Sequence, residues 1–267
     1  MGKAIRPFLL FVAVVQFFFA IAFFFQWPFA VNLWPFEGTT PLTFIFVSSI
    51  FAAAAASTAW AVLSGNLGAI AGIGLDYLTI LLPVGVFSFS LSGGDSGMVG
   101  YGILCLVGAV FGLALFLWAN RIPIPKTPPL PRPLRYIFIF FIIALAIVGG
   151  RLVLQVPDSI PWMITPELSV IMGWMFIGAL TYFAYALLRP SWANAAGQLA
   201  GFLAYDIVLI VPFLQRLPNT PPEQQLGMYI YTAVVLLSGL VAIYYLFVKQ
   251  ETRLVGGGSR VPRPHAA

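Results

Sequence analysis

Charged residues are scarce in this 267-residue chain. They make up 8% of it, whereas an ordinary soluble domain carries about 25%. Hydrophobic residues account for 61% of the sequence, which leaves too few polar side chains to cover a water-facing surface. The shortage of charge therefore excludes a soluble fold and favours a protein whose outer surface is covered by lipid.

Histidine and cysteine are almost missing, since the chain has one of each. Cys105 lies in an apolar run, so the sequence has no disulfide framework and no cysteine-rich metal site, and we expect a small buried side chain. His265 is the third residue from the C-terminal end, in a polar stretch. These shortages exclude histidine-ligated haem and a Ser/His/Asp nucleophile set. We therefore expect neither a cofactor nor an enzyme.

Long apolar runs are what the sequence has in abundance. Eight of them reach the length of about 20 residues that a helix needs to cross the hydrocarbon core of a bilayer. We expect an all-α polytopic membrane protein with eight transmembrane helices, at residues 7–26, 41–63, 67–89, 98–119, 134–155, 166–188, 192–214 and 227–248.

The eight runs form two groups of four, and the second group repeats the first. The third and seventh runs match at one fixed offset, through the pairs Gly68 and Gly197, Gly72 and Gly201, and Pro83 and Pro212. Because four is an even number, both copies enter the membrane in the same sense. The sequence thus predicts two tandem parallel four-helix repeats, related by a twofold axis along the membrane normal.

The repeats set the expected domain boundaries. Residues 1–121 form the first repeat and residues 134–250 the second. The proline-rich segment 122–133 between them is expected to be an extended, semi-rigid cytoplasmic linker. The glycine- and proline-rich tail, residues 251–267, is expected to be disordered.

The basic residues indicate an orientation. With eight spans, most of them fall on one side of the membrane: Lys3, Arg6, Arg121, Lys126, Arg132, Arg135, Arg189, Lys249, Arg253, Arg260 and Arg263. The positive-inside rule then places both termini in the cytoplasm. The same one-sided distribution explains the net charge of +5, because basic residues on the cytoplasmic side set the orientation and contact the lipid bilayer as partner. We therefore expect no nucleic acid partner.

The segments 32–35 (NLWP) and 40–43 (TPLT) resemble a motif of uncharacterised multi-pass membrane proteins of bacteria. The resemblance covers this short stretch and the overall hydropathy, and the second half of the chain keeps only Trp162, Thr165 and Pro166 of it. It implies a setting in the bacterial inner membrane. It implies no function and transfers no catalytic residue.

Two acids lie inside expected spans, Asp76 in the third and Asp206 in the seventh. An aspartate at the centre of a transmembrane helix costs roughly 2.5–3.5 kcal/mol on insertion scales, so such residues are functional candidates by default. In the repeat, Asp76 aligns with Tyr205, and Tyr77 aligns with Asp206. Each half therefore has one aspartate–tyrosine pair at the same depth.

Helical spacing assigns faces to these residues. Two matching stripes predict that spans three and seven pack together near the axis: Gly68, Gly72, Asp76 and Pro83, and Gly197, Gly201, Tyr205 and Pro212. Asp76 would face that contact, whereas Asp206 is turned from it by about 100° and shares a face with Gln198. Each proline removes a helix hydrogen bond and is expected to kink its helix. In the alternative interpretation, each aspartate only bonds a neighbouring hydroxyl and fixes helix packing.

Arg151, near the outer end of the fifth span, has two interpretations as well. Its side chain either extends to the outer interface, or points inward and pairs with Asp206.

Two classes of function remain open at this stage. The first is a small-solute or proton-coupled transporter, in which Asp76 and Asp206 face one shared cavity between spans three and seven. The second is a non-catalytic accessory or assembly subunit of a larger membrane complex, because eight spans offer few side chains to solvate a substrate. A small molecule or ion is the partner in the first case, and another membrane protein is the partner in the second.

Overall fold

The computed structural model describes residues 2–124 and 127–252, and this part of the chain is helical without a β-strand. The elements are α1 (Gly2–Phe24), α2 (Pro28–Leu33), α3 (Pro41–Leu63), the 3₁₀ turn η1 (Leu67–Ala69), α4 (Ile70–Leu91), α5 (Ser96–Ala119), α6 (Arg132–Val153), α7 (Pro166–Leu188), α8 (Trp192–Arg216), the 3₁₀ turn η2 (Leu217–Asn219), α9 (Pro222–Ile243) and the π-helical turn η3 (Tyr244–Val248).

Eight helices of the described chain are long and apolar enough to cross a membrane. The expected all-α polytopic membrane protein is thereby confirmed. The second and sixth expected spans, 41–63 and 166–188, agree with α3 and α7 to the residue. Both begin with a proline, which has no N–H to leave unpaired in the first helical turn. The other spans agree to within a few residues, except that the first and the eighth each begin five residues earlier, at Gly2 and Pro222.

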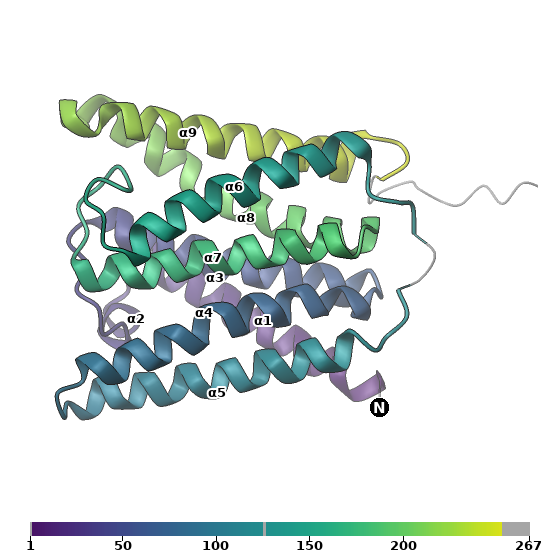
Figure 1. Cartoon of the computed structure of the whole chain (residues 1–267), viewed down its shortest axis with the longest axis horizontal. Helices are drawn as coiled ribbons and strands as arrows, with labels where there is room; N and C mark the ends of the chain where they lie inside the picture. The colour runs from purple at the N-terminus through teal and green to yellow at the C-terminus, as the bar shows by residue number, and fades with distance from the viewer. Residues whose placement is uncertain (1, 125–126, 253–267) are drawn as a thin grey trace, which may run out of the picture.

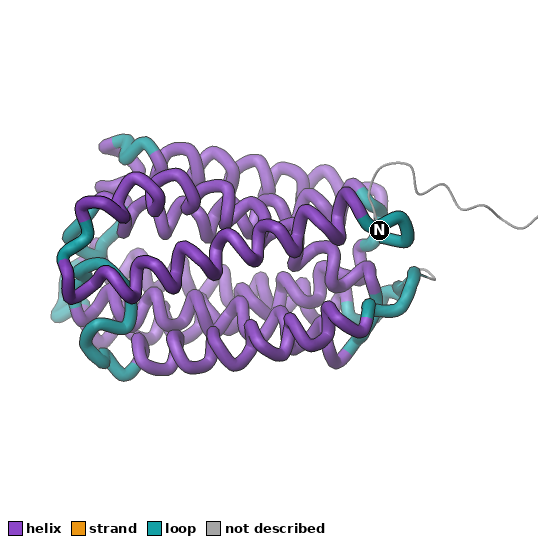
Figure 2. The backbone as a smooth tube through the Cα atoms, turned by 90° about the horizontal axis from the view of Figure 1, so that it is seen from above, coloured by secondary structure: helices purple, strands orange, loops and turns teal. Residues whose placement is uncertain are grey.

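The eight long helices run side by side along the long axis of the molecule, and the loops gather at its two ends (Figures 1 and 2). The start of α1 and the last described residues after η3 lie at the same end (Figure 1), as an even number of crossings requires. We call this the terminal end and the other the distal end. The terminal end holds Arg6, Arg121, Arg132, Arg189 and Lys249, and the distal end holds Glu37, Asp95, Asp158 and Glu223.

The long helices form an inner layer of four, and one outer helix packs on each inner helix. In the inner layer, α3 packs on α8 and α4 packs on α7, so each of these pairs joins the two halves of the chain. In the outer layer, α1 covers α3, α5 covers α4, α6 covers α7 and α9 covers α8. Each contact has an equivalent in the other half: α1 with α3 corresponds to α6 with α7, α4 with α5 corresponds to α8 with α9, and α3 with α8 corresponds to α7 with α4. A twofold relation between the halves would produce this pattern. The tandem repeat itself stays a prediction.

The expected packing of span three against span seven is wrong, because α4 and α8 are not among the closely packed pairs. The glycines face other helices. A Cβ added at Gly72 would lie 2.5 Å from the ring of Tyr182 on α7, and one added at Gly201 would overlap Ser57 on α3. A stripe of small residues shows which helix face permits a close approach, and it does not show which partner makes it.

The segment between the halves is held in place where it is described. The backbone N–H of Trp192 donates to the carbonyl of Pro128 over 2.9 Å, and Leu130 is buried. Pro129 pairs with Ser191 in an isolated antiparallel bridge. The linker is thus attached to the turn between α7 and α8 and does not act there as a free spacer. Lys126 lies outside the described residues.

The first residues of the expected tail continue the fold. Thr252 is buried, and its Oγ1 donates to the carbonyl of Tyr245 over 2.7 Å. Glu251 forms an ion pair of 3.4 Å with Lys249. The rest of the tail, residues 253–267 with His265, lies outside the described residues, so the expectation of disorder stays a prediction there.

Candidate functional site

A partly open cavity of about 810 Å³ has side chains from all the long helices in its wall. It extends from the inner helices to exposed residues of the outer ones, such as Phe140 and Ile230. Its volume falls within the range of about 300–1,000 Å³ that is common for small-molecule sites. Most of the wall is aromatic or aliphatic, including Phe46, Ile73, Ile80, Phe176 and Phe202. The cavity also reaches Asp158 and Glu223 at the distal end.

Asp76 places a carboxyl group in this wall from the middle of α4. Its Oδ1 atom is buried and has no hydrogen-bond partner among the described residues. The carboxyl group stands against Gly178 of α7, where an added Cβ would come within 2.5 Å of Oδ1. Buried polar atoms are nearly always paired with protein or water. Oδ1 is enclosed against α7, whereas Asp76 as a residue is partly exposed and lines the cavity, so a solute in the cavity would reach the carboxyl group from its exposed side.

Three more polar side chains line the same cavity and, with Asp76, form what we call the Asp76 cluster. Gln16 of α1 donates from Nε2 to the hydroxyl of Tyr77 over 2.6 Å, whereas its Oε1 is buried without a partner in the described chain. The buried hydroxyl of Tyr182, on α7, also lacks a partner there. Three helices, α1, α4 and α7, thus bring unsatisfied polar atoms to one cavity.

The opposite part of the wall comes from α8 and α9. Gln198 and Tyr205 of α8 line the cavity as well. The hydroxyl of Tyr205 is hydrogen-bonded to that of Tyr231 on α9. Ser57 of α3 donates to the carbonyl of Gly197 over 2.9 Å, which ties α3 to α8 beside the cavity. In this part of the wall, the tyrosine hydroxyls are therefore paired with each other.

Asp206 is not part of this site, and the expectation that both aspartates face one cavity is wrong. Asp206 is 4% exposed and lies outside the wall of the cavity. Its Oδ1 accepts a hydrogen bond of 2.8 Å from Ser238 on α9. One residue along a helix turns the side chain by about 100°, so Asp206 points to α9 while Tyr205 points inward. Its second oxygen, Oδ2, is buried without a partner in the described chain, so the contact with Ser238 pairs only one oxygen of this carboxyl group.

The remaining candidates from the sequence do not line the cavity. Arg151 is exposed and donates to the carbonyl of Pro157 over 3.3 Å, as a side chain extended to the interface would. Cys105 is buried, as expected. Pro83 and Pro212 lie inside α4 and α8. In the described chain, no group of three or more metal-ligating side chains comes together.

Sequence reasoning missed Tyr182. Its place in the second span of the second half corresponds to Ser57 in the first half, when the two are aligned on Pro41 and Pro166. Both residues line the cavity, and both face the glycine stripe of the opposite half. The alignment of the two halves could therefore have identified Tyr182 as a candidate. A tyrosine in an apolar span does not stand out by itself.

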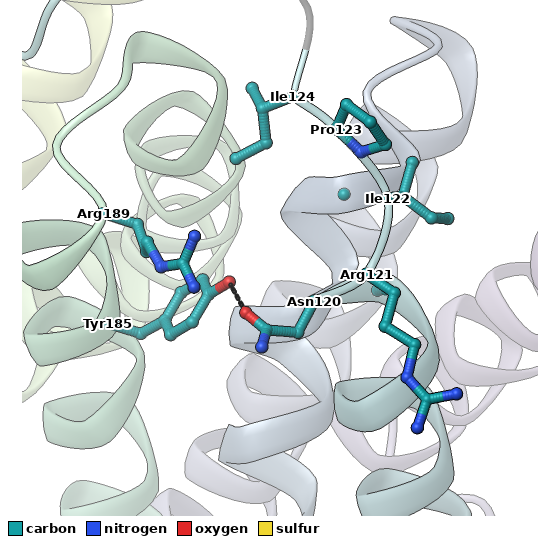
Figure 3. A pocket seen from close by; sticks show the side chains of 9 residues that line it. Asn120, Arg121, Ile122, Pro123, Ile124, Tyr185 and Arg189 are labelled. Carbon is teal, nitrogen blue, oxygen red and sulfur yellow. Dashed lines mark hydrogen bonds between the residues drawn. The ribbon is translucent and has the colours of Figure 1, made fainter.

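A second pocket, of about 220 Å³, opens at the terminal end between the end of α5 and the end of α7. The hydroxyl of Tyr185 donates to Oδ1 of Asn120 over 3.1 Å, and Arg189 lies beside them (Figure 3). The side chain of Arg121 points away from this pair (Figure 3). The polar atoms of the pair satisfy each other, so this pocket lacks the unpaired groups of the larger cavity.

The fold and the cavity together define a class: an all-α polytopic membrane protein with a mainly apolar cavity whose wall has the carboxyl group of Asp76 at depth and those of Asp158 and Glu223 at the distal end. No protein-family model matches the chain, and no curated protein or solved structure matches it either.

Proposed function

We propose that this protein is a carrier that moves a small amphipathic solute across the bacterial inner membrane, and that the solute binds in the cavity at Asp76. The observation that carries the proposal is the carboxyl group of Asp76 in the wall of a cavity of about 810 Å³, with one of its oxygens buried and unpaired in the described chain. An ionisable side chain at this depth is costly, and here no neighbouring side chain compensates for the cost. Binding of a solute provides that compensation.

The packing supports a transport cycle. The pairs α3 with α8 and α4 with α7 are closely packed, whereas α3 meets α4, and α7 meets α8, over far fewer residues. The cavity lies among these four helices. Tilting one close pair against the other would open the cavity toward either end, as in carriers in which one bundle moves against another around a fixed site.

The proposed orientation has both termini in the cytoplasm. Most basic residues of the described chain lie at the terminal end, with Arg151 and Arg216 at the distal end as the exceptions, and the positive-inside rule then assigns the terminal end to the cytoplasm. The cavity reaches the distal end through Asp158 and Glu223. In this orientation, the part of the cavity at Asp158 and Glu223 faces the periplasm, and Asp76 lies deeper, closer to the start of α4 than to its end.

The alternative function is that of a non-catalytic accessory subunit of a larger membrane complex. A subunit of that kind needs outer helix faces for its partners and has no use for an unpaired acid in its interior. The outer apolar faces of α5, α6 and α9 are exposed, but lipid covers such faces in any membrane protein. The cavity therefore favours the carrier.

The carrier proposal is tested by untargeted metabolite analysis of cells that express the parent protein, the Asp76→Asn variant or the Asp206→Asn variant. We expect the parent to change the distribution of at least one compound between cells and medium, and Asp76→Asn to abolish that change. Asp206→Asn keeps an oxygen that can accept the hydrogen bond from Ser238 and should behave like the parent. If no compound is redistributed by the parent, the carrier proposal fails.

A further inference from the structure

We propose that the solute is a monovalent organic cation with aromatic or aliphatic bulk, such as a substituted ammonium or phosphonium ion; this inference rests on the proposed carrier function. Its basis is the charge of the cavity wall. Asp76 lies at depth, and Asp158 and Glu223 lie at the distal end. No lysine, arginine or histidine of the described chain lines the cavity.

Around Asp76, the unpaired atoms are two acceptors, Oδ1 of Asp76 and Oε1 of Gln16, and the hydroxyl of Tyr182, which can donate or accept. The side-chain amide of Gln16 donates to Tyr77. None of these groups is a positively charged donor. An anionic solute would meet the carboxyl group without any basic side chain in the wall to offset the repulsion. A cation compensates the buried carboxylate.

Aromatic rings supply a second attraction for a cation. Phe46 of α3 stacks on Phe176 of α7 with ring centres 5.4 Å apart, and Phe202 of α8 lies 5.9 Å from Tyr205. All four rings line the cavity, as does Tyr182 next to the Asp76 cluster. Ring faces attract cations within about 6 Å, and the same rings accommodate apolar substituents. A cation with a bulky apolar body satisfies both features at once.

An inorganic cation fits this cavity poorly. Hard cations such as Ca²⁺ take about six to eight oxygen ligands at short distance. In the described chain, no cluster of three or more acidic, histidine or cysteine side chains could hold a metal. A volume of about 810 Å³ with a mostly apolar wall leaves a small ion with few ligands. The size and the polarity of the cavity thus select an organic ion.

The test uses the purified full-length protein and labelled tetraphenylphosphonium as the probe. We expect saturable binding of one probe per chain, displaced by unlabelled tetraphenylphosphonium and at least tenfold less well by neutral triphenylphosphine oxide or anionic tetraphenylborate. Asp76→Asn should weaken probe binding at least tenfold, whereas Asp76→Glu should restore most of it. Asp206→Asn serves as the matched control and should bind like the parent.

The outcomes separate this inference from the carrier proposal. Equal displacement by the neutral or the anionic competitor would overturn the cationic solute class, even if cells still redistribute a compound. Unchanged binding in Asp76→Asn, with both variants monodisperse on gel filtration, would overturn it too. If the parent protein binds the cationic probe selectively but redistributes no compound in cells, transport is overturned and the protein is a cation-binding protein.

Discussion

Replacing Ala179 with phenylalanine is expected to abolish solute redistribution in cells and to weaken tetraphenylphosphonium binding at least tenfold. Ala179 lies on the face of α7 that lines the cavity, together with Met175, Phe176 and Tyr182. These residues recur at the spacing of one helix face. An added ring at Ala179 would project into the space beside Asp76, so it would fill the cavity and not the packed contact between helices.

The matched control is Ala146→Phe on α6, at an exposed position that does not line the cavity. The same added ring would lie in lipid there and should leave both binding and redistribution unchanged. Thermal stability of both variants is measured in detergent, to show that each one folds. Full activity in a well-folded Ala179→Phe variant would mean that solute does not pass through this cavity.

The second large effect is expected on stability, for Gly178→Leu. A Cβ at Gly178 would lie 2.5 Å from Oδ1 of Asp76 and would overlap Ile80, at the contact where α7 packs on α4. Overpacking of this kind typically costs ~1–3 kcal/mol, and here the larger side chain also displaces the carboxyl group. We expect the midpoint of thermal unfolding in detergent to fall by several degrees and the yield of monodisperse protein to drop.

Gly150→Leu on α6 is the control for this substitution, since nothing lies within 4 Å of an added Cβ there. It should keep the unfolding midpoint of the parent. A Gly178→Leu variant as stable as Gly150→Leu would show that α4 and α7 do not approach closely at this level. The Asp76 cluster would then have a different geometry from the one described.

Hydropathy was sufficient to predict the spans. A helix needs about 20 apolar residues to cross the hydrocarbon core of a bilayer, and the apolar runs at 41–63 and 166–188 therefore predicted the bounds of α3 and α7. Each run begins with a proline that follows a threonine, Thr40 or Thr165. The short helix α2 was missed because its six residues, Pro28–Leu33, are too few to carry a periodic pattern. Length and composition thus predict crossings better than they predict the loops between them.

Helix partners were much harder to predict. In a soluble protein, an apolar stripe marks the buried face, but in lipid the outer face is as apolar as the inner one. The glycines of α4 and α8 marked faces of close approach, but no sequence pattern assigns Gly72 to Tyr182 or Gly201 to Ser57. The assumption that equivalent helices meet at the axis led to the wrong pair.

The same limit explains the candidate site. Asp76 was predicted to face a contact with span seven, whereas its carboxyl group lies against Gly178 of α7. Asp206 was grouped with it because both are acids at similar depth. The partner of the Oδ1 atom of Asp206 is Ser238, which lies 32 residues away on α9, and no pattern in the sequence links the two. Whether a buried acid is satisfied depends on neighbours that only the packing reveals.

The most direct test of the account is whether a water-soluble cation can reach the cavity. Cys105, the one native cysteine, is replaced by alanine, and Ala179→Cys is then introduced. Membranes are treated with a trimethylammonium-bearing methanethiosulfonate reagent. We predict rapid labelling at position 179, slowed by saturating tetraphenylphosphonium, and no labelling of the lipid-facing Ala146→Cys control. If Ala179→Cys stays unlabelled from both sides of the membrane, the interior is closed to solutes, which contradicts the carrier.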